Sequence, residues 1–138
     1  MRLGKYGVVS VAVACICASV LAHDAAAPAE SVSPLLQQPI ANLPGKTFTS
    51  VTVNFPPGAK AEPHRHVDAF VYAYVLAGSV RSQLDDEPAK VYRTGDNWFE
   101  APGAHHKVTE NTSGTEPARL LVVFVSTTGA PLKTLDPH

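Results

Sequence analysis

Four histidines fall into two pairs whose spacing could place several imidazoles around one metal ion. The first pair is His64 and His66, and the second is His105 and His106. Successive side chains of a β-strand point to opposite faces, so His64 and His66 would point the same way. Their imidazoles could then reach one ion together. His105 and His106 would point to opposite faces, so only one of them could supply a third ligand.

A single His-x-His sequence is more often a pair of surface or hydrogen-bonded histidines than a metal site, and a motif match is only a hypothesis. Here each pair follows a turn that contains Pro and Gly, at residues 57–58 and again at residues 102–103. This recurrence favours the metal site over the surface interpretation.

The segments around these histidines have the pattern of short strands separated by turns. Between residues 46 and 126, runs rich in β-branched and aromatic residues alternate with turn residues every eight to twelve positions. About seven or eight short strands in such a pattern are typical of a β-sandwich or barrel. No stretch after residue 46 shows a helical period. The sequence therefore predicts one all-β domain.

Two motifs in this domain resemble those of the cupin superfamily. The first, in residues 58–78, reads Gly, five residues, His-x-His and then a later Gly. The second, in residues 95–106, starts with Gly and ends in Ala-Pro-Gly-Ala-His-His. The resemblance covers about residues 46–126. It implies a double-stranded β-helix, which is a jelly-roll-like barrel, with a divalent metal ion bound inside its mouth.

Carried over position by position, the resemblance implies that His64, His66 and His106 are the metal ligands. His105 would then point outward or line the rim. By alternation, Tyr72 would face away from the metal if its neighbour Val71 faces it.

The carboxylate that usually completes the first motif is missing. Its position holds Val71, and no Glu lies between His66 and Gly78. Three neutral imidazoles leave the ion with its full positive charge and with open positions for water, substrate or dioxygen. Gln83 and Asp68 are alternative fourth ligands, and the sequence does not choose between them and water.

Resemblance to three-histidine cupins implies a non-haem, dioxygenase-like enzyme that uses Fe(II) and a small chelating substrate with oxygen ligands. Mn, Ni, Cu and Zn also suit such a ligand set. One alternative is a non-catalytic small-ligand or sugar binding or sensing protein of the cell envelope, whose metal site is structural or vestigial. Another is isomerase or lyase chemistry, in which the ion acts only as a Lewis acid. Catalytic residues are not predicted.

The N-terminal 22 residues predict a secretory signal peptide, and hence export to the periplasm or the cell exterior. Arg2 and Lys5 precede an uncharged run that ends in Val-Leu-Ala at residues 20–22. A retained membrane anchor is the alternative, since the run is near the lower length limit for a bilayer span. Cleavage would remove both cysteines, which would exclude thiol chemistry from the mature domain.

The rest of the chain divides by composition. Residues 23–45 are rich in Ala, Pro and Ser and predict an N-terminal arm or tether, residues 46–128 the barrel, and residues 129–138 a C-terminal tail. The formal net charge is -1 and no basic patch stands out, so we expect no nucleic-acid partner. We expect a small-molecule ligand, no membrane association after cleavage and, from the family resemblance, a homodimer.

Overall fold

A computed structural model describes residues 28–137, and its regular elements are all β-strands. The predicted signal peptide, residues 1–22, lies outside the described residues. Within residues 28–137 no helix is long and apolar enough to cross a membrane.

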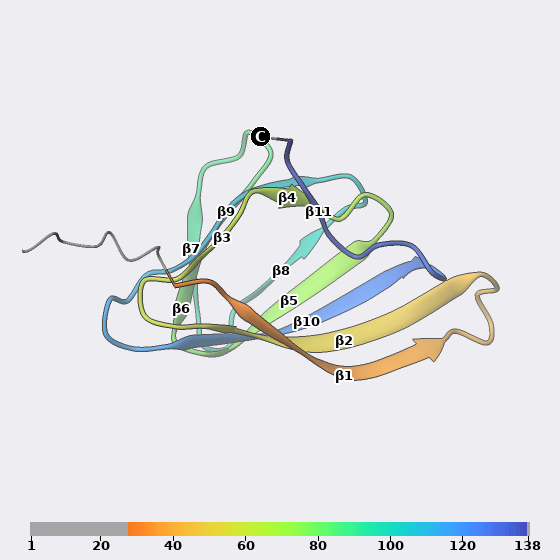
Figure 1. The fold of residues 1–138 in the computed structure, drawn as a ribbon, viewed down its shortest axis with the longest axis horizontal. Coiled ribbons are helices and arrows are strands. Elements are labelled where there is room, and N and C mark those ends of the chain that lie inside the picture. Colours follow the sequence, from red (N-terminus) through yellow and green to blue (C-terminus); the bar gives the residue numbers. More distant parts are fainter. Residues whose placement is uncertain (1–27, 138) are drawn as a thin grey trace, which may run out of the picture.

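The strands of residues 28–137 form two antiparallel sheets (Figure 1). The five-stranded sheet has the order β1-β2-β10-β5-β8, and the six-stranded sheet has the order β11-β4-β9-β6-β7, with β3 also paired to β9. The strands are β1 (Ser31–Pro39), β2 (Lys46–Phe55), β3 (Lys60–Ala61), β4 (His64–Arg65), β5 (Phe70–Ala77), β6 (Ser79–Leu84), β7 (Lys90–Arg93), β8 (Asn97–Glu100), β9 (His105–Asn111), β10 (Ala118–Thr127) and β11 (Thr134–Leu135).

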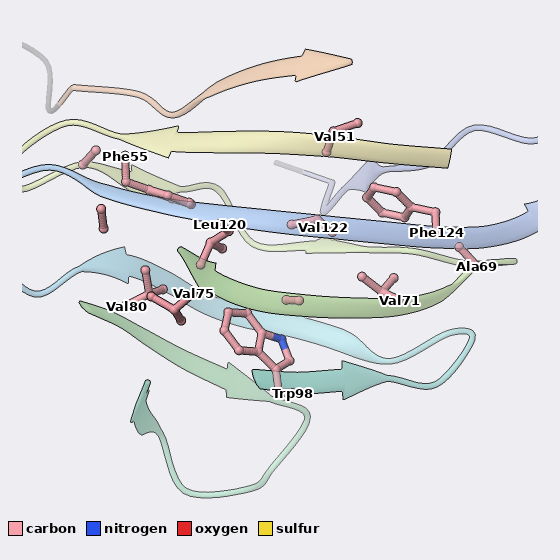
Figure 2. Close-up of a cluster of buried hydrophobic side chains, with 13 residues drawn as sticks. Val51, Phe55, Ala69, Val71, Val75, Val80, Trp98, Leu120, Val122 and Phe124 are labelled. Carbon is pink, nitrogen blue, oxygen red and sulfur yellow. The ribbon is translucent and has the colours of Figure 1, made fainter. Parts of the chain in front are cut away.

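Alternating burial explains why the longer strands form and where the core lies. In β10, Leu120, Val122 and Phe124 are buried, while Arg119, which points to the opposite face of the strand, is exposed. In β5, Val71 and the other odd-numbered residues as far as position 75 are buried. The inward side chains pack between the two sheets (Figure 2), as expected for strands that cover one hydrophobic core.

This architecture confirms the predicted all-β, jelly-roll-like barrel. The eleven strands within residues 28–137 exceed the seven or eight predicted, because β3, β4 and β11 each contain only two residues. Two residues are too few to show the alternation by which strands are recognised in a sequence.

The segments outside residues 46–128 also contribute strands. Residues 31–39 form β1, which pairs with β2 along its length, and residues 134–135 form β11, which pairs with β4. All nine residues of β1 are exposed, so the strand has no buried face and its sequence shows no alternation. Pro34 is tolerated because β1 is an edge strand and its register shifts just after that residue.

The turn between β5 and β6 depends on Gly78. Its φ is +74°, in the left-handed region that favours glycine. A Cβ there would lie 2.7 Å from the carbonyl oxygen of Pro117 and 2.9 Å from the Cα of Ala118. This close approach lets the chain pass from the five-stranded sheet directly to the six-stranded sheet.

Candidate metal centre

Three histidines from neighbouring segments converge inside the barrel. His64 in β4 lies directly opposite His106 in β9 in the strand register, and His66 follows two residues after His64. Each side chain is at most 7% exposed. The ring centroids of His64 lie 4.8 Å from His66 and 5.1 Å from His106. One nitrogen from each ring lies within 4.8 Å of the others, so the three could hold a metal ion.

Backbone carbonyls determine which nitrogens of the first pair carry protons. Nδ1 of His64 donates to the carbonyl oxygen of Glu62 at 2.7 Å, and Nδ1 of His66 donates to that of Leu132. A carbonyl oxygen only accepts, so both Nδ1 atoms carry hydrogen and both Nε2 atoms of the neutral rings have a free lone pair. Such second hydrogen bonds are typical of metal-binding histidines.

Burial keeps these two rings neutral. Burial lowers the pKa of His64 to about 4, although the hydrogen bond to Glu62 opposes the change. Burial also lowers the pKa of His66, against the opposing effects of the Leu132 carbonyl and Glu100. At neutral pH both imidazoles are therefore uncharged, which is the form that binds metal ions.

The two free lone pairs face each other. Nε2 of His64 lies 3.2 Å from Nε2 of His66, and in the neutral rings neither atom has a proton to donate to the other. Two imidazole nitrogens that both bind the same Zn²⁺-sized ion, each at about 2.0–2.1 Å, lie roughly 3.0–3.4 Å apart. The observed separation fits a shared cation.

A bulge in β9 places two polar side chains in the site. The β6–β9 register shifts between Gln83 and Leu84, so that His106 and Thr109 are both buried although they are three residues apart. Nε2 of His106 lies 2.8 Å from Oγ of Ser82 and 2.7 Å from Oγ1 of Thr109. A hydroxyl can donate or accept. These contacts hold the ring in place in either of its neutral tautomers.

The sequence reasoning missed Glu100, the last residue of β8. Its side chain is 2% exposed, and Oε1 accepts a hydrogen bond from Nε1 of Trp98 at 3.2 Å. Oε1 also lies 3.1 Å from Nδ1 of His106, and Oε2 lies 3.8 Å from Nε2 of His66. The alternation of side chains along β8 could have identified it, because Trp98 and Glu100 lie on the same face of the strand and that face points into the core.

The charge state of Glu100 follows from these contacts. Burial acts to raise the pKa of the Glu100 carboxyl, but the hydrogen bond from His106, the electrostatic effects of the nearby His106 and His66 rings and the hydrogen bond from Trp98 together lower it below its usual value. The side chain is therefore a carboxylate at neutral pH.

Neither alternative fourth ligand considered from the sequence lies at this site. Gln83 points away from the cavity because its neighbour Ser82 points inward, and its amide donates to the carbonyl oxygen of Glu87 at 3.0 Å. Asp68 accepts a hydrogen bond from the backbone N–H of Thr127 and pairs with Lys46 at 3.7 Å. Both suggestions are therefore corrected.

The first histidine of the later pair is turned away from the centre. Nε2 of His105 lies 2.6 Å from Oδ2 of Asp136 in the C-terminal segment. His105 is half-buried and does not line the cavity that contains the other three histidines.

The centre opens on an apolar cavity of about 170 Å³. Where the described residues line it, the only ionisable groups besides the three histidines and Glu100 are Glu30 and Lys133, which pair at 2.8 Å. The remaining lining is almost entirely hydrophobic: Val32, Val51, Val53, Phe55, Ala61, Val71, Ala73, Trp98, Thr109, Leu120, Val122, Phe124 and Leu132. This arrangement suits a small ligand with an apolar body and a polar end directed at the histidines.

Comparison with solved structures shows where this fold occurs. The cupin domain of Cnp3 from Schizosaccharomyces pombe superposes with a TM-score of 0.61 at 15% identity, over 72% of this chain and 62% of that one. An uncharacterised double-stranded β-helix protein from Klebsiella pneumoniae gives 0.61 at 19%, over 79% and 85%. The DMSP lyase DddQ from Ruegeria pomeroyi gives 0.54 at 23%, over 64% and 42%. At these identities the likeness establishes the fold alone.

Comparison at the sequence level identifies the family. No curated protein matches the chain. The profile of the family described as "Cupin domain" matches residues 51–124, which is more than half of the chain and includes all three histidines of the centre. The chain therefore belongs to the cupin family.

Proposed function

We propose that this cupin binds a divalent metal ion through His64, His66 and His106. The observation that carries the proposal is the approach of the two Nε2 lone pairs to 3.2 Å, with both Nδ1–H groups already bonded to backbone carbonyls. Without a cation the two lone pairs repel each other in a buried site. A shared ion turns the same geometry into two metal–nitrogen bonds.

The groups that surround the three histidines have distinct tasks in this proposal. The carbonyls of Glu62 and Leu132 orient two of the imidazoles, and Ser82 holds the third. The apolar walls exclude bulk water, which strengthens electrostatic interactions inside the cavity. Fe(II), the ion we favour, would supply Lewis acidity and a redox couple when bound, and Mn, Ni, Cu or Zn would also suit nitrogen ligands.

The cavity supports a small substrate that chelates through oxygen. Its volume of about 170 Å³ is close to that of an apolar cavity of roughly 150 Å³ that binds benzene. The one lysine among the described residues that line the cavity, Lys133, is already paired with Glu30, so the cavity is poorly suited to a polyanion. We propose dioxygenase-like activity on a small enol, diketone or catechol-like compound.

Metal analysis tests the binding proposal. The purified protein, reconstituted with Fe(II), Mn(II) or Zn(II) and desalted, should retain about one ion per chain by elemental analysis. His64→Ala should abolish retention, while His105→Ala should not, since His105 lies outside the cavity and bonds to Asp136. Equal metal retention by the two variants, or none by the wild-type protein, would refute the proposal.

Oxygen uptake with the Fe(II)-loaded protein and small chelating substrates tests the activity. Replacing Fe(II) by Zn(II) should abolish a redox reaction, whereas an isomerase or lyase that uses the ion only as a Lewis acid would keep its activity.

Non-catalytic ligand binding is the second candidate. It is favoured by the shortage of ionisable side chains in the cavity away from the histidines and Glu100. The apolar lining supports a small hydrophobic ligand better than a sugar. A ligand that raises the melting temperature equally with and without metal would favour this candidate, because binding to the folded state alone stabilises it.

Export and dimer formation also stay proposals. Cleavage after Ala22 predicts a mature N-terminus at His23, which N-terminal sequencing of protein from the cell envelope would test. A homodimer predicts elution at twice the monomer mass, and a monomer mass at all concentrations would refute it.

A further inference from the structure

We propose that Glu100 is a fourth protein ligand of the ion, so that strand β8 supplies the carboxylate that the first motif lacks. The inference rests on the metal-binding function proposed above and goes beyond it, because it names a ligand from a different strand. It also changes the expected chemistry of the centre.

Glu100 is placed so that its carboxylate can occupy the same part of the cavity as an acid on β5 would. Val71, which occupies the place of the missing acid in β5, is the direct cross-strand partner of Glu100 in β8. Directly opposite residues of antiparallel strands have Cβ atoms about 4.5–5.5 Å apart on the same face. Both side chains line the same cavity. A carboxylate at position 100 therefore enters the centre one strand away from position 71.

The contacts of the carboxylate point toward the histidines. Oε1 lies 3.1 Å from Nδ1 of His106, a distance that suits a hydrogen bond in the metal-free chain and two ligands of one ion in the metal-bound chain. Oε2 lies 3.8 Å from Nε2 of His66, the atom whose lone pair also faces His64. The carboxylate thus spans two of the three proposed histidine ligands.

Within residues 28–137, one oxygen of this carboxylate lacks a hydrogen-bond partner. Trp98 donates its indole N–H to Oε1, whereas Oε2 is buried and has no donor among these residues. Leaving a buried charged acceptor without a partner is costly, and such groups in folded proteins call for an explanation. A metal ion bound between Oε2 and the histidine nitrogens would satisfy this oxygen.

The fourth ligand alters the charge and the preference of the centre. Three neutral imidazoles leave a divalent ion with a net charge of two, and one carboxylate reduces that charge by one. Oxygen ligands favour harder ions such as Mn(II) and Fe(II) over Cu and Zn compared with an all-imidazole set. We therefore expect Glu100 to contribute to selectivity as well as to affinity.

Mn(II) affinity of three variants tests the proposal. Glu100→Gln should weaken Mn(II) binding at least about tenfold, since even loss of an outer partner of a ligand costs about 10–100-fold. The matched control is Glu110→Gln, because Glu110 lies on β9 and pairs outside the cavity with Lys60 and Arg81. The double variant Val71→Glu/Glu100→Val returns the carboxylate to β5 and should recover affinity.

Water-proton relaxivity of bound Mn(II) separates a ligand from a positioning residue. Glu100→Ala should add one exchanging water to the ion, because water takes the vacated position of an octahedral centre. If Glu100 only orients His106, affinity falls but the water count stays unchanged, and the proposal is overturned. Equal Mn(II) affinity in Glu100→Gln and wild type also overturns it.

Two further results complete the design. Circular dichroism and thermal melts establish that each variant is folded, and the Glu100→Ala measurement stands even if the double variant fails to fold. If neither wild type nor Glu110→Gln binds metal, the proposed function fails together with this inference. If both bind and Glu100→Gln binds equally well, only the fourth ligand is refuted.

Discussion

Acidification should destabilise the metal-free protein, because His64 is buried in its neutral form. Its pKa is about 4 in the folded chain and about 6.5 in an unfolded chain. Between these values the unfolded state binds a proton that the folded state does not. The free energy of unfolding is therefore highest above pH 6.5, falls as the pH drops, and loses the whole contribution near pH 4.

The magnitude follows from the separation of the two pKa values. Each pKa unit corresponds to about 1.4 kcal/mol, so His64 alone accounts for at most about 3 kcal/mol between pH 7 and pH 4. The lowered pKa of His66 acts in the same direction. The lowered pKa of Glu100 adds to the loss at the acid end, because a carboxylate stabilised by folding must take up a proton.

Urea denaturation in the presence of a chelator, at several pH values from 7.5 to 4.5, measures this dependence. His64→Gln keeps a neutral polar side chain and should flatten the curve by most of His64's contribution. His105→Gln, at a histidine outside the cavity, is the matched control. It should leave unchanged the part of the pH dependence of the free energy of unfolding that His64 contributes. A free energy of unfolding that stays constant from pH 7 to pH 4.5, or an unchanged slope in His64→Gln, would refute the reasoning.

Three other perturbations test individual parts of the structure. Ser82→Ala removes one of the two hydroxyls that hold His106 and should weaken metal binding up to about tenfold, measured by chelator competition; unchanged affinity would argue against this role. Deleting residues 131–138 removes the carbonyl that orients His66 and should weaken metal binding in a chain that stays folded by circular dichroism. Gly78→Ala forces a Cβ against the backbone at positive φ and should cost more than about 1 kcal/mol in urea denaturation.

Much of the fold was predictable because its signal is local. The buried positions of β5 and β10 alternate with partly or fully exposed ones, and turn residues interrupt the strands, so the all-β class follows from the pattern alone. The edge strand β1 gives no such signal, because all its residues are exposed. Its pairing with β2 is decided by the tertiary structure.

The histidines illustrate how far spacing can predict a site. Alternation predicted that His64 and His66 point the same way, and both side chains line the same cavity although β4 ends at Arg65. The resemblance to the cupin motif indicated His106 as the third member of the group. The structure brings the three together as expected from the sequence. Whether they bind a metal stays a prediction for the experiments above.

The sequence by itself determined the barrel class through short-range periodicity, and it indicated the three histidines that meet in the barrel through their spacing and their resemblance to the cupin motifs. Only the tertiary structure placed Glu100 beside them, because that contact depends on the pairing of β5 with β8, where Glu100 lies opposite Val71. Thr109 likewise faces the site through a bulge in β9 that alternation does not predict. Cross-strand register is set by the packing of the whole barrel, and it decides which carboxylate completes the centre.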